Sequence, residues 1–347
     1  MNNSSKPTVV VTGGAGYIGA HTIISLLENT AFQVVSMDNF SNSSPKTFDR
    51  ITQITGKTVL NLNVDLCDAK ATQSAFSQLE NVVGIIHFAA LMSVPDSVKR
   101  PLAYYHNNIE SMINVLQMAQ DFHISNFIFS SSCSVYGNIE TLPVKESTPM
   151  GKAESPYAYT KQVGEALLRD IAKSEADIQT IALRYFNPVG AHESGLIGDD
   201  PDNKPFNLVP IVTQTAIGIR EKMMVYGNDY PTRDGSCVRD YIHVMDIAEA
   251  HVKALQYLVN KQNEKPFSVL NLGTGNGVSV FEAIASFEKV SGVKLNYEVG
   301  TRRPGDVAAI YSNTELSQQV LNWQPKYSLD DMMLSAWKWQ KNLANLK

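Results

Sequence analysis

A tyrosine and a lysine four residues apart, Tyr157 and Lys161, have a spacing suited to proton transfer. Residues four apart lie on one face of a helix, and the preceding Ser155 and Pro156 are a typical helix start. A phenol with a pKa of ~10 is a poor base at neutral pH, but a nearby ammonium group favours the phenolate. An ordinary amphipathic helix gives the same spacing, so the pair needs support from other parts of the chain.

Part of that support is a serine-rich run, residues 130–134 (Ser-Ser-Ser-Cys-Ser), which ends an apolar segment that is predicted to be a strand. Ligands of parallel α/β sheets bind beyond the carboxyl ends of the strands. The serines therefore predict hydroxyl groups at the edge where a ligand binds, and we expect them to share one site with Tyr157 and Lys161.

A glycine-rich segment directly after the first apolar run has the spacing of a nucleotide-binding loop. Gly13, Gly16 and Gly19 follow residues 8–11 and open a helical stretch. Glycine permits a tight turn and lets the backbone approach a pyrophosphate at a helix N-terminus. A glycine triplet alone also occurs in a plain strand–helix turn. Asp38 strengthens the interpretation, because a carboxylate after the second strand binds the adenosine ribose hydroxyls.

Asp38 also discriminates between two cofactors. Its carboxylate would repel a 2′-phosphate, and residues 39–44 carry no Arg or Lys that could bind one. The pattern therefore favours NAD over NADP. Asp65, after the third predicted strand, is either a contact to the adenine or a solvated loop acid.

Short apolar runs alternate with helical stretches through the first half of the chain. Strands buried on both faces of a parallel sheet read as continuous apolar runs. In the helical stretch 108–122, an apolar stripe is formed by Ile109, Met112, Ile113, Leu116 and Ala119. The alternation predicts a doubly wound, Rossmann-like α/β fold with a parallel sheet. The predicted strands are residues 8–11, 34–37, 59–62, 83–86, 126–129 and 180–183.

The pattern changes near Asn187. Residues 188–207 and 227–235 are rich in Gly, Pro, Asp and Asn, which predicts long loops. We therefore expect two domains, a cofactor-binding one and a smaller α/β one for the substrate. Their expected bounds are 1–187 and 188–347, with parts of 240–260 packing back on the first domain.

Composition and charge disfavour several classes of function. Lys and Arg number 29 against 34 Asp and Glu, a net charge of −5, and there is no basic run, so nucleic acid and anionic membranes are disfavoured as partners. No stretch approaches about 18 apolar residues and residues 1–7 do not read as a secretory signal, which predicts a cytoplasmic location. Cys67, Cys133 and Cys237 form no disulfide framework or metal motif, and no metal site is expected.

Taken together, these motifs resemble the extended short-chain dehydrogenase/reductase family, and within it the UDP-glucose 4-epimerases. The resemblance covers nearly the whole chain, and its later segments are more specific than the motifs common to the fold. The segments that carry it are residues 12–19 (TGGAGYIG), Asp38 with Asn39, 87–90 (HFAA), 127–137 (FIFSSSCSVYG), 155–161 (SPYAYTK), 183–191 (LRYFNPVGA), 207–210 (NLVP), 225–231 and 238–246 (VRDYIHVMD).

The resemblance implies a homodimeric enzyme that interconverts UDP-galactose and UDP-glucose through a transient 4-keto sugar, with NAD regenerated in each turnover. Tyr157, as a phenolate beside Lys161, would remove the proton of the sugar 4-hydroxyl, and Ser132 would relay it. The implied NAD contacts are Gly13, Gly16, Tyr17, Ile18, Asp38, Asn39, Asn42, Ser43, Asp65, Leu66, Phe88, Ala89, Ala90, Asn107, Tyr157, Lys161 and Tyr185. The implied UDP-sugar contacts are Ser132, Tyr157, Asn187, Asn207, Leu208, Tyr226, Arg239, Arg303 and Asp306.

The chain departs from the family pattern at two positions. Met92 stands where family members direct a lysine at the cofactor. Ile310, followed by Tyr311, stands where a tyrosine is typical of glucose/galactose enzymes and a small residue is typical of enzymes that also accept N-acetylhexosamines. The pattern favours glucose and galactose and leaves UDP-N-acetylhexosamine epimerisation, alone or as a dual activity, as the alternative.

Other functions share part of this pattern. A nucleotide-sugar dehydratase of this family places Asp-Glu directly after the active-site hydroxyl, where this chain has Cys133 and Ser134. A net reductase must exchange its cofactor in every cycle, and a dinucleotide-sensing regulator has no need of a Ser–Tyr–Lys set. Residues 273–277 (GTGNG) resemble a second phosphate-binding loop, but no acid follows at the nucleotide-binding distance, which favours a plain turn.

Overall fold

The computed structural model of the chain describes residues 6–174, 177–200, 205, 207–303 and 306–346. The chain divides into two compact units, which are described separately below. The first comprises residues 1–138, 147–185 and 248–270, and the second comprises residues 139–146, 186–247 and 271–347. The two domains expected from the sequence, with their boundary at residue 187, remain a prediction.

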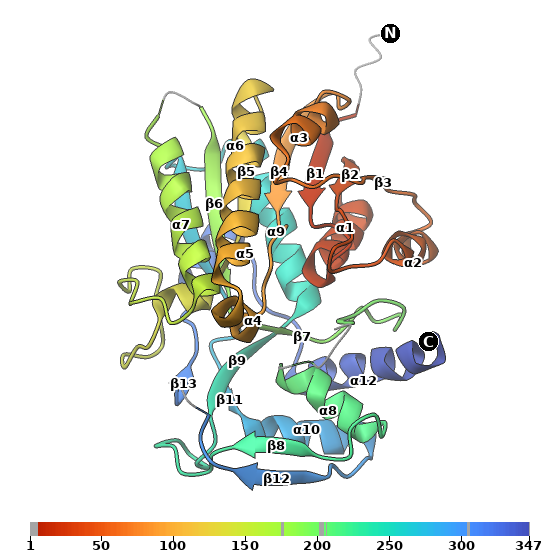
Figure 1. Ribbon diagram of the computed structural model, residues 1–347, viewed down its shortest axis with the longest axis vertical. Helices are drawn as coiled ribbons and strands as arrows, with labels where there is room; N and C mark the ends of the chain where they lie inside the picture. Colours follow the sequence, from red (N-terminus) through yellow and green to blue (C-terminus); the bar gives the residue numbers. More distant parts are fainter. Residues whose placement is uncertain (1–5, 175–176, 201–204, 206, 304–305, 347) are drawn as a thin grey trace. The chain divides into compact units, whose positions relative to one another are not determined.

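A seven-stranded sheet forms the centre of the first unit (Figure 1). Its strand order is β10-β6-β5-β4-β1-β2-β3, and β1 to β6 pair in parallel. The order reverses between β1 and β4, where such folds bind ligands. The six predicted strands and the doubly wound fold are confirmed. The strands are β1 (Thr8–Thr12), β2 (Gln33–Met37), β3 (Leu60–Leu62), β4 (Val82–His87), β5 (Asn126–Ser132), β6 (Gln179–Tyr185) and β10 (Phe267–Leu272).

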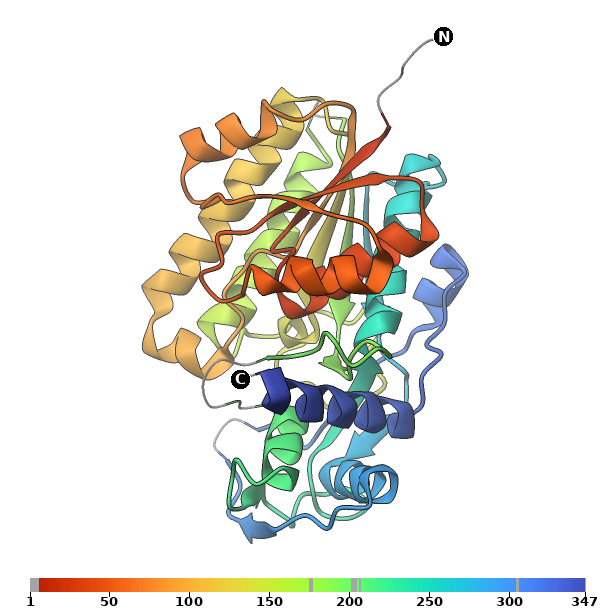
Figure 2. The same ribbon diagram turned by 90° about the vertical axis from the view of Figure 1, so that its right-hand side faces the viewer.

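Helices cover both faces of this sheet, as Figure 2 shows. One face carries α1 (Tyr17–Asn29), α2 (Lys46–Thr55) and the part of α9 (Val244–Val259) that belongs to the first unit. The opposite face carries α3 (Ala69–Phe76), α6 (Ser111–Asp121) and α7 (Pro156–Ile171). Between β4 and α6 lie α4 (Val94–Lys99), α5 (Pro101–Tyr105) and a π-helical turn over His106–Glu110.

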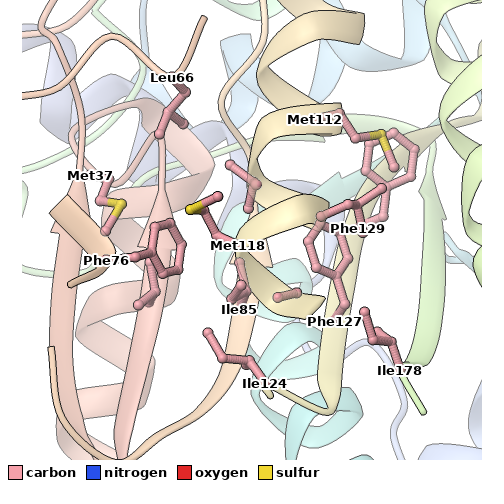
Figure 3. Packing of buried hydrophobic residues seen from close by; sticks show 14 of the residues in the cluster. Met37, Leu66, Phe76, Ile85, Met112, Met118, Ile124, Phe127, Phe129 and Ile178 are labelled. Carbon is pink, nitrogen blue, oxygen red and sulfur yellow. The ribbon is translucent and has the colours of Figure 1, made fainter. Parts of the chain in front are cut away.

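The core between the sheet and α3, α6 and α7 is continuous and apolar (Figure 3). Phe76, Ile85 and Phe127 are each at most 1% exposed there. The stripe predicted on residues 108–122 is wrong at Ile113, which is 48% exposed. The buried face is centred on Met112, and Ile113 lies about 100° around the helix from it.

The described part of the second unit contains two small sheets, four helices and the first residues of α9. β7 and β13 pair in parallel with β9, and β11 pairs with it antiparallel, whereas β8 pairs with β12. The strands are β7 (Asn187–Val189), β8 (Met223–Tyr226), β9 (Val238–His243), β11 (Gly277–Ser279), β12 (Tyr297–Gly300) and β13 (Ala309–Ile310). The helices are α8 (Leu208–Ala216), α10 (Val280–Ser291), α11 (Glu315–Leu321) and α12 (Leu329–Leu346).

One of the two predicted loops needs a correction. Residues 187–189 form a strand, so the loop expected over 188–207 starts later, and residues 201–204 and 206 lie outside the described residues. The loop at 227–235 is confirmed. In the described part of the chain, none of the helices has both the length and the apolar composition that crossing a membrane requires.

Candidate active site

The serine run lies at the carboxyl end of β5, as expected. Ser130, Ser131 and Ser132 close this strand, and Ser132 caps the short 3-10 turn Cys133–Tyr136 by accepting from the Ser134 N–H. α7 begins directly after Ser155, whose hydroxyl accepts from the Ala158 N–H. This cap fixes the first turn of α7, which carries Tyr157.

Ser132 and Tyr157 are hydrogen-bonded through their hydroxyl groups. Burial raises the pKa of the Tyr157 phenol to about 12, and the hydrogen bond with Ser132 acts against this increase. The pair therefore places a half-buried phenol beside the serine hydroxyl at the end of β5.

Lys161 lies one turn further along α7 and is 5% exposed. Its Nζ donates to the carbonyl oxygen of Ser130 at 2.7 Å and lies 5.7 Å from the centre of the Tyr157 ring. Burial lowers the pKa of the Lys161 ammonium to about 7, while the Glu165 carboxylate acts to raise it. Nearby, burial and the charge of Lys161 lower the pKa of His87 to about 3, so this imidazole is neutral.

These values correct one expectation from the sequence. The lysine was expected to favour the phenolate of Tyr157, yet in the chain alone the phenol keeps its proton at neutral pH. The reason is that burial disfavours charge on both groups, and the lysine directs its Nζ at Ser130. Ionisation of Tyr157 therefore needs positive charge beyond that of Lys161.

Sequence reasoning missed a buried ion pair behind these residues. Glu165 on α7 and Arg184 on β6 are 0% and 3% exposed, and Arg184 donates to both carboxylate oxygens of Glu165, at 2.8 and 2.6 Å. Two signals were available in the sequence: an arginine inside the otherwise apolar run 180–185, and a glutamate four residues after Lys161.

The glycine loop joins β1 to α1 and folds tightly against the segment after β4. Gly13 has φ +68°, and a Cβ on it would lie 2.8 Å from the backbone nitrogen of Ala89. A Cβ on Gly19 would lie 2.3 Å from the Gly13 oxygen. Gly16 is the N-cap of α1 and offers no side chain to the first helical turn. This end of α1 therefore suits an anion.

Asp38 follows β2 and is 9% exposed. Its Oδ2 accepts from the Ala15 N–H at 2.9 Å, and its Oδ1 accepts from the Phe40 N–H and the Ser43 hydroxyl at 2.9 and 2.8 Å. A carboxylate offers about four acceptor positions, so about one remains for a ligand hydroxyl. Asp38 thus ties the glycine loop to the segment after β2.

The other predicted cofactor contacts lie on neighbouring segments of the same unit. Leu66 is buried in the core, whereas Asp65 is exposed and accepts from the Cys67 N–H. The hydroxyl group of Tyr185 is hydrogen-bonded to that of Ser130. Tyr17 and Ile18 open α1, Asn39 and Asn42 follow β2, Phe88, Ala89 and Ala90 follow β4, and Asn107 lies in the π-helical turn.

These features fit a dinucleotide. The first unit offers a helix N-terminus capped only by glycine, glycines at the two positions where a Cβ would collide with backbone, and an acid after β2 with an acceptor position to spare. Such a cofactor would be held with its pyrophosphate at Gly13 and Gly16 and its adenosine ribose at Asp38.

A cationic cluster lies in the second unit. Arg303 donates to both carboxylate oxygens of Asp306, at 3.0 and 2.9 Å, and Arg239 Nη2 lies 3.6 Å from Asp306 Oδ1. The Arg303 guanidinium lies over the Tyr226 ring, 5.3 Å from its centre. Two guanidiniums on one carboxylate keep a net positive charge, and their planar donors suit a pyrophosphate.

Not every predicted substrate residue belongs to this cluster. Asn187 begins β7, Asn207 is the N-cap of α8 and Leu208 is the first residue of α8. Among the described residues, none of the three takes part in the hydrogen bonds, ion pairs or ring contacts of the Arg239–Arg303–Asp306 cluster. They remain predictions.

The turn at 273–277 does not act as a phosphate loop. The buried carboxylate of Asp240 already accepts from the backbone N–H groups of Thr274 and Gly275, at 2.8 and 3.2 Å. The same carboxylate accepts from the N–H and the hydroxyl of Ser312. The structure therefore favours the plain turn that the sequence suggested.

Known proteins with similar sequences include enzymes that act on nucleotide sugars, as the geometry of the site suggests. The family model described as GDP-mannose 4,6 dehydratase matches residues 10–335. A UDP-glucose 4-epimerase of Erwinia amylovora is 46% identical over 333 residues, which is 96% of this chain and 97% of that protein.

Two solved structures are similar over almost their full length. A UDP-glucose 4-epimerase from Stenotrophomonas maltophila with bound NAD and formylated UDP-arabinopyranose has a TM-score of 0.94 and 41% identity, covering 99% of this chain and 100% of that one. The enzyme from Bifidobacterium longum in complex with NAD+ and UDP has a TM-score of 0.91 and 43% identity, covering 97% and 99%. The chain therefore belongs to the extended short-chain dehydrogenase/reductase family, and within it to the UDP-glucose 4-epimerases.

Proposed function

We propose that this chain interconverts UDP-galactose and UDP-glucose by oxidising C4 of the hexose to a transient ketone and reducing it again on the opposite face. The observation that carries the proposal is the hydrogen-bonded Ser132–Tyr157 pair, with Lys161 beside it, in the same unit as the dinucleotide loop. NAD, when bound, supplies the acceptor and the donor of the C4 hydride.

Ser132 and Tyr157 handle the proton of the 4-hydroxyl. Tyr157 accepts this proton directly or through Ser132 and returns it when the ketone is reduced, so the full cycle consumes no proton. Because the pKa of Tyr157 is about 12 in the chain alone, the base form requires added positive charge, to which Lys161 contributes.

The cofactor is held by the glycine loop and by Asp38. Gly13 and Gly16 leave space for a pyrophosphate at the N-terminus of α1, and Asp38 accepts from a ribose hydroxyl. Asp38 would repel a 2′-phosphate, which supports NAD over NADP.

The nucleotide part of the substrate is assigned to the second unit. Arg239 and Arg303 share the Asp306 carboxylate and so present two guanidiniums whose charge is only half neutralised. A pyrophosphate matches both their charge and their donor geometry. Asn187, Asn207, Leu208 and Tyr226 complete the proposed contacts of the UDP-sugar.

A second candidate concerns the sugar. Ile310 in β13 is 7% exposed and in register with Arg239 on β9, so an aliphatic side chain adjoins the strand that carries a proposed pyrophosphate ligand. The Stenotrophomonas maltophila relative has a different UDP-sugar bound, a formylated UDP-arabinopyranose. Activity on UDP-N-acetylgalactosamine is therefore the alternative that a direct assay must compare.

We also propose that the protein is a homodimer and lies in the cytoplasm. Support for the dimer comes from apolar side chains exposed on α4, α5 and α6: Val98 is 62%, Leu102 80% and Ile113 48% exposed. Analytical ultracentrifugation tests it, with a Leu102→Glu variant expected to shift the protein towards monomer. None of the three cysteines, all within the described residues, forms a disulfide, which is consistent with a reducing compartment.

The test of the function is product identification. Purified protein incubated with UDP-galactose is expected to yield UDP-glucose with no net NADH, and parallel incubation with UDP-N-acetylgalactosamine measures the second candidate. Tyr157→Phe is expected to lower turnover by about 10²–10⁴-fold, the usual contribution of a positioned proton-transfer group. Tyr159→Phe, a 49% exposed tyrosine on the same helix, is the matched control and is expected to retain turnover.

Two outcomes would contradict the proposal. Full turnover by Tyr157→Phe would remove that phenol from the mechanism. Accumulation of NADH, or of a dehydrated sugar, would favour a reductase or a dehydratase.

A further inference from the structure

The buried Glu165 joins α7 and β5, which carry the proposed proton-transfer residues, to β6. It lies one turn of α7 beyond Lys161 and is 0% exposed. Its Oε1 accepts from the Ser131 hydroxyl of β5 at 2.5 Å and from Arg184 Nε of β6 at 2.8 Å, and its Oε2 accepts from Arg184 Nη2 at 2.6 Å. One carboxylate therefore fixes α7 against the ends of two strands.

The contact between Glu165 and Ser131 affects the neighbouring residues of β5. Ser131 is bonded to Glu165, whereas its neighbour Ser132 is bonded to Tyr157 and its other neighbour Ser130 accepts, through its carbonyl, from Lys161. Three consecutive residues at the end of β5 therefore contact α7. Holding Ser131 in place restricts the positions in which Ser130 and Ser132 present their groups to α7.

The Glu165 carboxylate also acts to raise the pKa of the Lys161 ammonium. The Lys161 ammonium lies over the Phe129 ring and donates to the Ser130 carbonyl, both of β5, and lies beside the Tyr157 ring of its own helix. His87 of β4 and Glu165 of α7 interact electrostatically with it. On β6, Arg184 pairs with Glu165 and Tyr185 is hydrogen-bonded to Ser130. The pKa of His87 is lowered to about 3 and that of Tyr157 is raised to about 12, so both side chains are uncharged near pH 7. Burial also raises the pKa of Tyr185.

From this geometry we propose that Glu165 is a positioning residue, which keeps Lys161 protonated and in place beside Tyr157, with Arg184 and Ser131 holding the carboxylate. The proposal rests on the function proposed above, because it gives Lys161 its task. Glu165 acts only through Lys161 and its neighbours and makes no contact with the reacting atoms. This positioning role would explain why the chain keeps the buried Glu165–Arg184 ion pair, because a buried ion pair by itself contributes little stability.

The experiment must separate this role from a structural one. Glu165→Gln alone leaves Arg184 buried and unpaired, which is strongly destabilising. The double variant Glu165→Gln/Arg184→Gln keeps a neutral hydrogen-bonded pair in the same place and removes both charges. Gln162→Met is the matched control, because Gln162 anchors the same turn of α7 through neutral hydrogen bonds to the carbonyls of Val135 and Gly151, both 2.8 Å long.

The first readout is independent of turnover. Protein labelled with ¹³C at the lysine Cε is titrated by NMR without substrate, and the Lys161 resonance is identified by its loss in Lys161→Met. In the wild type, the resonance is expected to titrate near pH 7. In the double variant we expect the midpoint to fall by up to about one pH unit, because Glu165 raises the pKa of Lys161 and Arg184 is not among the groups that shift it. In Gln162→Met, the midpoint is expected to stay in place.

The second readout is the pH dependence of kcat with UDP-galactose. In the double variant, Lys161 is expected to lose its proton at a lower pH. The alkaline limb of the kcat profile should therefore shift to lower pH by about as much as the Lys161 midpoint, with KM changed less than about twofold. An unchanged Lys161 midpoint in the folded double variant would overturn the proposal. An altered midpoint in a protein that does not epimerise UDP-galactose would instead retain the role of Glu165 and refute the proposed function.

Discussion

Replacing Lys161 with methionine is expected to stabilise the ligand-free protein while impairing the enzyme. The buried ammonium donates to the Ser130 carbonyl at 2.7 Å, and its pKa is lowered from 10.5 to about 7, chiefly by burial. This lowering corresponds to roughly 5 kcal/mol of unfavourable free energy for keeping the charged form in the fold. Loss of the ammonium–carbonyl hydrogen bond offsets about 1.5–3 kcal/mol of the gain. We therefore expect the free energy of unfolding at pH 6 to rise by about 2–3 kcal/mol.

The sign of the pH dependence follows from the same value. Between pH 7 and 10.5 the folded lysine has lost its proton and the unfolded lysine keeps it, so the wild type gains stability with rising pH in this window. Methionine does not titrate. The advantage of Lys161→Met is therefore greatest below pH 7 and shrinks towards pH 10.5.

The assay is urea unfolding of the ligand-free protein, followed by far-UV circular dichroism at pH 6 and pH 9. Tryptophan fluorescence does not suit the purpose, because all three tryptophans, at 323, 337 and 339, belong to the second unit. Lys173→Met is the control, because Lys173 is exposed just beyond α7 and should change stability by less than about 0.5 kcal/mol. No stabilisation at pH 6, or an advantage that grows with pH, would refute the reasoning. In the same variant, kcat is expected to fall by about 10²-fold.

Two further substitutions test the binding groups. Gly13→Ala should abolish retention of NAD, because the new Cβ lies 2.8 Å from the Ala89 nitrogen at φ +68°; Gly56→Ala has the same φ but open space, so bound NAD measured after gel filtration should persist there. Arg303→Ala should weaken UDP binding by about tenfold or more in calorimetry, the effect of losing a charge-assisted contact. Arg302→Ala removes a neighbouring arginine that pairs with Asp229 instead, and equal losses in both variants would contradict the assignment of Arg303.

Much of the first unit could be predicted from the sequence, because strands buried on both faces are continuous apolar runs. β10 was missed as a member of this sheet, since only tertiary pairing shows that residues so far along the chain join it. β7 was missed because three residues containing Pro188 carry almost no strand signal, and pairing with β9 decides their conformation.

The sequence motifs of the site could be predicted, whereas the protonation states and ion-pair partners of its residues could not. The glycine loop, Asp38, Ser132, Tyr157 and Lys161 could each be found from type and spacing. The protonation states could not, because burial sets them and spacing does not report burial. The partnerships of Glu165 with Arg184 and of Asp306 with Arg239 could not be predicted either, because each joins residues far apart in the sequence.

The fate of the hydrogen at C4 of the sugar tests the proposed hydride transfer. UDP-galactose carrying deuterium at C4 is incubated with the protein in ordinary water, and the UDP-glucose product is examined by mass spectrometry and NMR. The account predicts that the deuterium remains at C4 of the product, because the hydride removed from the sugar is returned to it within one turnover. Exchange of that deuterium for hydrogen, or its appearance at another carbon, would contradict the account.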